Sequence, residues 1–277
     1  MHNTTVRIPA PANEPVLSYA PGSPERARLQ ARIRQLKSET VDIPAIIGGR
    51  EVRTGRTRPV VMPCEHGHVL AHCHLAGPAE VNQAIEAALA AHATWSTLSW
   101  IERASILLKA AELLSKRHRM VINAATMLGQ GKNVLQAEID AACETIDYLR
   151  YNVYFASQIY AGQPRSTLEQ LNRMEYRPLE GFVFTVSPFN FTAIASNLNL
   201  SVALMGNTTV WKPASTALLS NYHLMRLLME AGLPPGVVNF VPGQGSVVGA
   251  TALAHPMLAG VHFTGSNATF NQLWRSV

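Results

Sequence analysis

Residues 181–266 alternate short apolar strand candidates with helix candidates, and this alternation constrains the fold more than any other feature of the sequence. The four strand candidates are Gly181–Val186, Thr208–Trp211, Val237–Val241 and Val261–Thr264. Strands separated by helices in this way predict a parallel sheet with crossover helices. Such sheets bind ligands at the carboxyl ends of their strands, and polar residues follow three of the four strands there. The sequence therefore predicts an α/β fold that holds a nucleotide at one edge of its sheet.

The composition is that of a globular protein. The chain has 277 residues, of which 47% are apolar, enough for one large α/β domain or two smaller ones. No apolar run reaches the ~18–20 residues of a membrane span, and residues 1–15 lack the apolar core of a signal peptide. Cys64, Cys73 and Cys143 do not make a disulfide framework. These features predict a soluble, cytoplasmic protein with no membrane partner.

Positive charge is concentrated near the start of the chain. The formal net charge is +5, and much of the excess comes from arginines between residues 26 and 58. A basic arm that binds nucleic acid would show this clustering, and so would a solvated helix followed by a β-hairpin. Because no nucleic-acid-binding motif accompanies the charge, we favour the solvated surface and expect no nucleic-acid partner. The net positive charge of the chain would also favour binding of an anionic ligand.

The N-terminal third is expected to hold one helix and two strand pairs. Met1–Gly22 is rich in proline and is expected to form an extended arm. Ser23-Pro24-Glu25 is typical of a helix start, and that helix would run to about Ser38. The expected strand pairs are Ile43–Val52, which turns at two glycines, and Thr57–Met62 with Val69–His74.

Helical spacing dominates the middle of the chain. We expect a short helix over Val121–Leu128, ended by glycines, and a long helix over Asn133–Ser157. Leu171–Arg177 is predicted to be a strand that leads into the alternating block. Ala268–Val277 has the pattern of a helix that continues, and a sheet that stops at its fourth strand leaves an open edge. The sequence therefore predicts a part of a longer protein.

Asn190 is the first candidate for chemistry. It follows Pro188, which fixes the backbone, and lies between two phenylalanines. A side-chain amide at the end of a strand can donate to an oxyanion as negative charge develops. The spacing alone favours a second interpretation, in which Asn190 caps the helix that begins near Phe191.

Lys212 and a set of glycines are candidates for binding phosphate. Lys212 follows a buried strand, so it is either a ligand for phosphate or ribose hydroxyls or a solvated surface lysine. Gly265-Ser266 opens a helix directly after a strand, where free backbone N–H groups suit a pyrophosphate. Gly243-Gln244-Gly245 with Gly249 forms a second glycine-rich turn, but its third glycine is displaced from the usual dinucleotide pattern.

One cluster has the residue types of a zinc site: Cys64, His66, His68, His72, Cys73 and His74. Its spacing matches none of the standard structural sites, and alternation along a strand would send these side chains to both faces of the sheet. We therefore predict no metal site.

The motifs together resemble the aldehyde dehydrogenase superfamily. Those that carry the general resemblance are Ser187–Phe191, Trp211–Pro213 and Phe263–Ser266. Further stretches are similar to the 1-pyrroline-5-carboxylate dehydrogenase family within it: Gly129–Lys132, Gln136–Ala142, Leu179–Phe182, Ser187–Ile194, Ala203–Asn207 and Glu230–Pro235. The resemblance implies a Rossmann-type parallel sheet with flanking helices, preceded by an N-terminal helix and β-hairpins. It divides the chain into an arm and helix over residues 1–40 and an NAD-binding region, incomplete at its C-terminus, over residues 41–277.

The resemblance also implies a function, the oxidation of L-glutamate γ-semialdehyde to L-glutamate with NAD in proline catabolism. Asn190 matches the residue that stabilises the oxyanion. Positions that match cofactor contacts are Ser187, Lys212, Gly265, Ser266, Asn267, Ala268 and Thr269. Positions that match substrate contacts are Glu138, Phe189 and Phe191. Many relatives have a glutamate where this chain has Ser215, and that glutamate binds the hydroxyls of the adenosine ribose. The resemblance implies that serine binds these hydroxyls more weakly.

The resemblance places the catalytic domain after the Phe-Thr-Gly-Ser motif. The nucleophilic cysteine and the general-base glutamate of the family both belong there, and none of the three cysteines in this chain matches the nucleophile's surroundings. We therefore expect the isolated chain to be inactive, as a nucleotide-binding fragment or half of a split enzyme. Full-length family members are expected to form homo-oligomers and to take an aldehyde as substrate.

Overall fold

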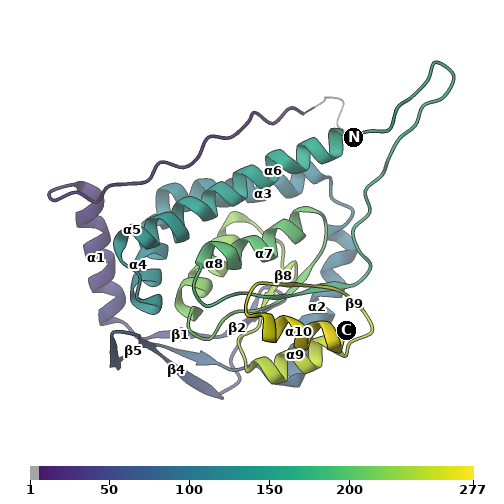
Figure 1. Ribbon diagram of the computed structural model, residues 1–277. Coiled ribbons are helices and arrows are strands. Elements are labelled where there is room, and N and C mark those ends of the chain that lie inside the picture. The colour runs from purple at the N-terminus through teal and green to yellow at the C-terminus, as the bar shows by residue number, and fades with distance from the viewer. Residues whose placement is uncertain (1–5) are drawn as a thin grey trace.

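The computed structural model describes residues 6–277, and a six-stranded mixed sheet forms its centre (Figure 1). The strand order is β3-β2-β8-β7-β6-β9. Its four parallel strands are β6 (Phe182–Val186), β7 (Thr209–Lys212), β8 (Val238–Phe240) and β9 (Leu258–Phe263). These strands confirm the predicted parallel sheet. The chain runs outward from β6 to β8 and then returns to place β9 on the other side of β6, so the strand order reverses between β6 and β9.

The first predicted strand pair belongs to this same sheet. β2 (Ala45–Ile47) and β3 (Arg50–Val52) form the expected hairpin, and β2 pairs antiparallel with β8. The second pair, β4 (Thr57–Met62) and β5 (Glu65–His74), is antiparallel as expected, and β1 (Val41–Ile43) joins it to make a separate three-stranded sheet.

Helices cover both faces of the central sheet. The α-helices are α1 (Pro24–Ser38), α2 (Pro78–Trp95), α3 (Trp100–Leu113), α4 (Arg119–Gln130), α5 (Val134–Ala137), α6 (Thr145–Ala161), α7 (Thr192–Leu204), α8 (Leu218–Ala231), α9 (Gly245–Leu253) and α10 (Asn267–Ser276). Within residues 6–277, no helix is both long enough and apolar enough to cross a membrane.

Alternation along the strands divides the core between the two faces. In β7, Val210 packs with the side chains of α2 and α9, whereas Trp211 packs on the opposite face with those of α3, α7 and α8. Both side chains are fully buried. Burial on both faces explains why apolar residues outnumber polar ones in the parallel strands.

Local signals account for several helix ends. Ser23 caps α1 through its hydroxyl, which accepts from the Arg26 N–H. α4 ends at Gly131, whose φ of 68° is left-handed and favours glycine. The predicted long helix over Asn133–Ser157 is interrupted, because Glu138–Glu144 is a π-helical segment between α5 and α6.

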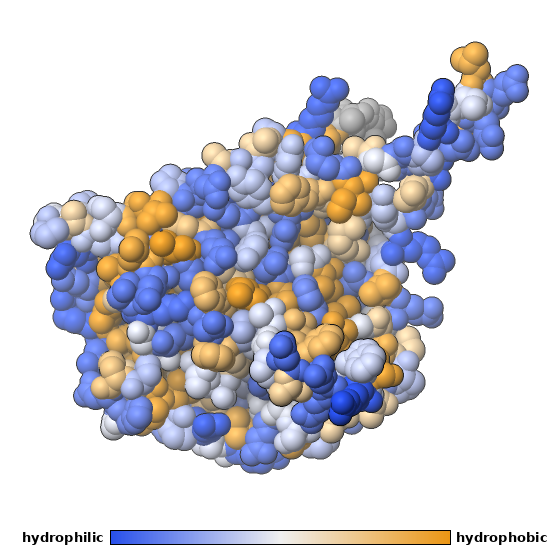
Figure 2. All heavy atoms as spheres, in the orientation of Figure 1, coloured by the Kyte–Doolittle hydropathy of each residue, from blue (hydrophilic) through white to orange (hydrophobic). Residues whose placement is uncertain are grey.

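Two long segments of the described chain lack helices and strands. The described part of the predicted arm, residues 6–22, lies along α4 and α6, where the Leu17 N–H donates to the Glu138 carboxylate at 2.8 Å (Figure 1). Residues 1–5 of that arm lie outside the described residues. The predicted strand over Leu171–Arg177 is wrong: it belongs to an irregular extension from 162 to 181 that projects from the body and carries mainly hydrophilic side chains (Figures 1 and 2).

Candidate functional site

Three adjoining cavities follow the carboxyl ends of the parallel strands. The Asn190 cavity, about 530 Å³, lies between the segments that follow β6 and β9, and its lining includes Asn190, Gly265 and Thr269. The glycine cavity, about 440 Å³, lies between α9 and α10 and shares Thr269. The Arg58 cavity, about 440 Å³, shares Lys212 with the glycine cavity. These shared residues make one elongated site, and its Asn190 end lies at the point where the strand order reverses, the usual ligand position in such sheets.

Asn190 is exposed and does not cap a helix. The residue at the N-cap of α7 is Phe191, which makes no side-chain capping bond. The Asp140 carboxylate occupies that position instead, because it accepts from the backbone N–H groups of Thr192 at 3.1 Å and Ala193 at 2.9 Å. The capping interpretation of Asn190 is therefore wrong. Its amide forms no hydrogen bond with another residue of the described chain and is free to donate into the cavity.

Asp140 and Lys132 position the loop that carries Asn190. Asp140 is buried, and the Lys132 ammonium lies 2.6 Å from its carboxylate. The same ammonium lies 4.0 Å from the centre of the Phe191 ring, in cation–π contact. The carboxylate at the N-terminus of α7 also suits the positive end of the helix dipole. Sequence reasoning missed this role, although both residues fall within motifs that carry the family resemblance.

The predicted cofactor residues Ser187 and Lys212 differ in how they are held. The Ser187 hydroxyl is buried and accepts from the Trp211 indole N–H at 3.0 Å, so it fixes the junction after β6. Lys212 is half-buried, and no partner for its ammonium is found within residues 6–277. Burial lowers the pKa of Lys212, the effect expected of an ammonium that has lost water without gaining a carboxylate. A ligand with phosphate or hydroxyl oxygens would restore those contacts.

The segment Gly265-Ser266-Asn267-Ala268-Thr269 forms the turn into α10. The Ser266 hydroxyl caps the helix by accepting from the Thr269 N–H at 3.2 Å. A Cβ at Gly265 would lie 2.5 Å from the Phe263 ring, so any other residue here would require that ring to move. Gly265, Ser266 and Thr269 all line the Asn190 cavity.

The displaced glycine pattern in α9 has a structural explanation. Gly245 and Gly249 are one helical turn apart, and both line the glycine cavity. A Cβ added to either residue would meet no atom within 4 Å, so their bare backbone faces open space. Gly245 also opens α9, where backbone N–H groups without helical partners can bind an anion. The displaced third glycine thus contributes to the cavity wall.

The predicted substrate residues do not gather in one place. Phe189 is 67% exposed and lines the Asn190 cavity, whereas Phe191 contacts Lys132 and lines a separate groove beside α6. Glu138 is fully buried and accepts from the Leu17 N–H, the Tyr19 hydroxyl, the Arg119 guanidinium and the Asn123 amide. The expectation that Glu138 faces a substrate is corrected: the N-terminal arm covers its carboxylate.

The cysteines lie away from the Asn190 cavity. Cys64 is exposed, Cys73 is buried beside β4, and Cys143 lines the groove beside α6. Burial raises the pKa of both Cys73 and Cys143 to about 12, which disfavours the nucleophilic thiolate. Within the described residues, no cluster of three or more His, Cys, Asp or Glu side chains has the arrangement of a metal site.

Comparisons with known proteins identify the family. Residues 51–277 match the family described as the aldehyde dehydrogenase family. A protein of Agaricus bisporus named delta-1-pyrroline-5-carboxylate dehydrogenase is 50% identical over 275 residues, which cover 99% of this chain and 50% of that protein. The mitochondrial protein of that name from Homo sapiens is 47% identical over 276 residues, or 100% of this chain and 48% of its own length. The chain thus spans about half the length of these relatives.

Solved structures give the same result. The Mycobacterium tuberculosis delta-pyrroline-5-carboxylate dehydrogenase bound with NAD superposes with a TM-score of 0.98 at 50% identity, covering 100% of this chain and 52% of that one. A 1-pyrroline-5-carboxylate dehydrogenase from Thermus with bound NAD gives a TM-score of 0.90 at 31% identity, covering 98% of this chain and 52% of that one.

Proposed function

The chain belongs to the aldehyde dehydrogenase family, and from that premise we propose that it forms the nucleotide-binding part of an enzyme that oxidises L-glutamate γ-semialdehyde to L-glutamate with NAD, in proline catabolism. One observation carries this proposal. The elongated site runs along the strand ends from the free amide of Asn190 to the unpartnered ammonium of Lys212. Relatives named for this activity, and their NAD-bound structures, support the choice of aldehyde and cofactor.

The residues fit a dinucleotide. The N-terminus of α9 and the bare face of Gly245 and Gly249 would hold the pyrophosphate, since no side chain separates the backbone from the cavity. Lys212 would donate to ribose hydroxyls at the far end. Bound NAD would supply the acceptor for the hydride that leaves the aldehyde carbon.

Asn190 would act at the reacting end. Its amide N–H would donate to the carbonyl oxygen of the aldehyde, most strongly when that oxygen carries negative charge after nucleophilic attack. Asp140 and Lys132 contribute by fixing the start of α7, so the loop need not reorganise as charge develops. Such preorganised donors contribute about 10²–10³ in turnover in other acyl-transfer sites.

A second function for the 277-residue chain, that of a nucleotide-binding fragment or half of a split enzyme without chemistry of its own, is favoured by the cysteine positions. No thiol of the described residues lines the Asn190 cavity. We therefore expect the purified chain to bind NAD without oxidising γ-semialdehyde. Turnover by this chain, with contamination excluded by an Asn190→Ala preparation made in parallel, would refute the expectation.

Calorimetry with NAD tests the binding site. We expect saturable binding below a dissociation constant on the order of 1 mM, the upper end of ordinary Michaelis constants. Gly249→Leu places a side chain in the glycine cavity and should weaken NAD binding by at least about tenfold. Gly67→Leu, at a glycine with equally open surroundings outside the three cavities, is the matched control and should leave binding unchanged. Absence of NAD binding by the unmodified chain would overturn the proposed cofactor site.

We further propose that the protein works in the cytoplasm and that its full-length form is a homo-oligomer. Its cysteines form no disulfide, which favours a reducing compartment such as the cytoplasm. The extension from 162 to 181 exposes Leu168 and Leu171, which association with another subunit would bury. Cell fractionation and analytical ultracentrifugation would test the two statements separately.

A further inference from the structure

The outer side of β9 is a free edge of the central sheet, because β9 pairs with β6 alone among residues 6–277. A register shift near its start leaves Gly260–Phe263 as the regular part of the strand. The Thr264 N–H donates to the Val186 carbonyl at 3.3 Å, and the direction of the backbone groups alternates along a strand. The N–H and C=O groups of Val261 and Phe263 therefore point away from β6, where a further strand could pair with them.

The other sheet edges of the described chain carry features that oppose pairing with a further strand. Free edges are usually blocked by charged side chains, by proline or by short length. β3 presents Arg50 and Glu51, β4 contains Pro59, and β1 is only three residues long. In β9 there is no proline, and His262 is its one ionisable side chain. The edge of β9 is thus open to pairing.

An apolar stripe of α10 flanks this open edge. Its members recur at helical spacing and are Phe270, Leu273, Trp274 and Val277. Phe270 is 53% exposed and Trp274 is 70% exposed, so nothing in the described chain covers them. A groove of about 310 Å³ lies between the stripe and β9. The stripe and the strand edge therefore form one apolar surface.

This surface is complementary to itself. A two-fold axis through His262, normal to the sheet, would place Val261 of one copy opposite Phe263 of a second copy. Each of the two resulting pairs exchanges two N–H···O=C bonds, because all the groups involved point outward. Such an axis keeps each face of the sheet on the same side, so the two α10 stripes would meet across the joint.

The charge and the size of the surface suit a weak contact between two copies. His262 and Arg275 are the ionisable side chains of β9 and α10, and the His262 Nδ1 lies 2.9 Å from the Leu198 carbonyl, so little like charge opposes pairing. An aromatic side chain buries 150–250 Å², so the exposed parts of Phe270 and Trp274 amount to roughly 250 Å² per copy. Two copies together stay below the ~1,200 Å² of a stable complex, even with the strand edges added.

We propose that two copies of this chain associate through β9 and α10, so that their central sheets join into one sheet across a two-fold axis at His262. The strands supply four backbone hydrogen bonds, and the α10 stripes cover each other. This contact is separate from the extension over 162–181, and it does not depend on the proposed cofactor.

Sedimentation equilibrium of the 277-residue chain tests the association. Between about 2 and 200 μM we expect a monomer–dimer equilibrium with a dissociation constant on the order of 10–100 μM. Trp274→Lys places a charge in the apolar contact and should weaken the dimer at least about tenfold. Leu168→Lys, at a fully exposed leucine of the extension, is the matched control and should leave the dissociation constant within about twofold.

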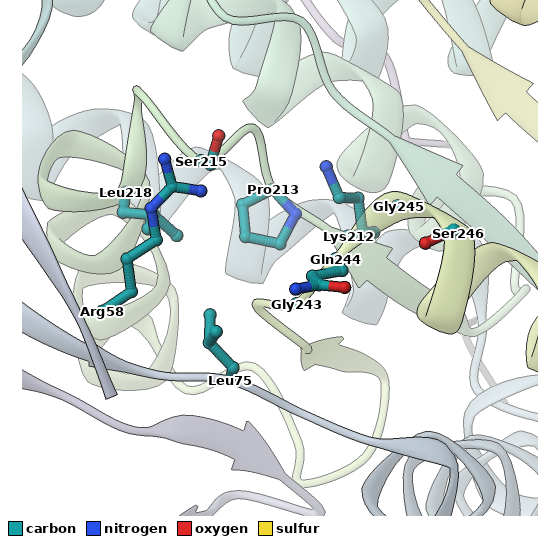
Figure 3. Close-up of a pocket in the computed structure, with 10 residues that line it drawn as sticks. All are labelled: Arg58, Leu75, Lys212, Pro213, Ser215, Leu218, Gly243, Gln244, Gly245 and Ser246. Atoms are coloured by element: carbon teal, nitrogen blue, oxygen red, sulfur yellow. The ribbon is translucent and has the colours of Figure 1, made fainter. Parts of the chain in front are cut away.

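The folding of the Trp274→Lys protein is checked independently of its association. Trp274 lines neither the glycine cavity nor the Arg58 cavity, whose residues Figure 3 shows. Its NAD affinity should therefore stay within about twofold of that of the unmodified chain. If the unmodified chain binds no NAD, the proposed cofactor site fails alone, and an unchanged midpoint of urea unfolding serves as the check instead.

Two further variants test the strand contact itself. Val261→Pro removes an outward N–H, which an edge strand tolerates, and should weaken the dimer at least about tenfold without unfolding the chain. His262→Cys, made with Cys64→Ser to remove the exposed native thiol, should form a disulfide between copies under an added oxidant, because residues opposite each other on the axis lie close enough to bridge. Val52→Cys, at the opposite edge of the sheet, is the matched control and should form none.

Three results would overturn the inference. A chain that stays monomeric at about 200 μM would leave this surface to a different protein segment. A dimer that Leu168→Lys abolishes and Trp274→Lys preserves would place the contact on the extension. A dimer in which His262→Cys forms no disulfide between copies would exclude pairing of the two β9 strands.

Discussion

Glu138→Gln should lower the free energy of unfolding by about 3–5 kcal/mol, the cost of breaking a buried ion pair by removing one charge. The Glu138 side chain is fully inaccessible, and its ion-pair partner Arg119 is 5% exposed. Burial alone would raise the pKa of Glu138, but hydrogen bonds from Arg119 and Tyr19 hold that pKa below its ordinary value of 4.5. The carboxylate is therefore charged at neutral pH and stabilises the folded chain.

The hydrogen bonds of Glu138 account for a loss of unfolding free energy of the same size. One carboxylate oxygen accepts from the Leu17 N–H at 2.8 Å and the Arg119 Nε at 3.1 Å. The other accepts from the Tyr19 hydroxyl at 2.6 Å and the Asn123 amide at 2.7 Å. Glutamine keeps one acceptor oxygen. Its NH₂ group faces two obligate donors if it points toward Leu17 and Arg119, and if it points toward Tyr19 and Asn123 those two groups must reorient to accept, while the charge that pairs with Arg119 is lost in both cases. Two lost charge-assisted bonds at about 1.5–3 kcal/mol each account for the loss.

Urea unfolding followed by circular dichroism measures this loss. The midpoint should fall by about 1 M or more, because a chain of this size has an m-value of a few kcal/mol per molar. Glu112→Gln is the matched control: Glu112 pairs with Lys116 on the surface, is 55% exposed, and should cost less than about 1 kcal/mol. A Glu138→Gln protein within about 1 kcal/mol of the unmodified chain would refute the buried network and would favour an open, substrate-facing Glu138.

Three further substitutions have defined outcomes. Asp140→Asn should lower the free energy of unfolding by about 2–3 kcal/mol, because it removes both the Lys132 ion pair and the charge at the N-terminus of α7. An unchanged midpoint of urea unfolding would contradict this prediction. Asn190→Ala should change unfolding by less than about 0.5 kcal/mol, since Asn190 is exposed and unpaired, and a loss above about 1 kcal/mol would restore its capping role. Burial and, secondarily, the charge of Arg32 lower the pKa of His223 from 6.5 to about 4. The unfolded chain therefore binds more protons between these values, so stability should rise with pH from 4 to 6.5 by about 3 kcal/mol, and His223→Gln should flatten that rise.

Features with a local cause were predictable from the sequence. The Ser23 cap, the β2–β3 hairpin and the four parallel strands each follow from residues within a few positions of one another. The positions of Asn190 and Lys212 were predictable for a related reason, because the ends of parallel strands meet at one edge whatever the details of packing.

Features that depend on distant partners were not predictable in this way. Leu171–Arg177 has apolar residues at 171, 174 and 176, but no strand within residues 6–277 pairs with it, so it stays irregular. The pairing of β2 with β8 joins residues 46 and 240, and no short-range pattern encodes it. The capping of α7 by Asp140 spans 52 positions. Arg58 is similar in sequence to its paired neighbours Arg53 and Arg56, and only the tertiary structure shows which of the three remains free.

The contacts of the N-terminal arm also fix the order in which the molecule can assemble. Leu17 and Tyr19 bind Glu138 across 121 and 119 positions, so on a ribosome the arm must wait until α4 and the π-helical segment have emerged. Closing so long a loop costs entropy that only the finished contacts return. We expect the arm to dock only after α4 and the π-helical segment have formed, so that the Glu138 carboxylate keeps its water until the arm covers it.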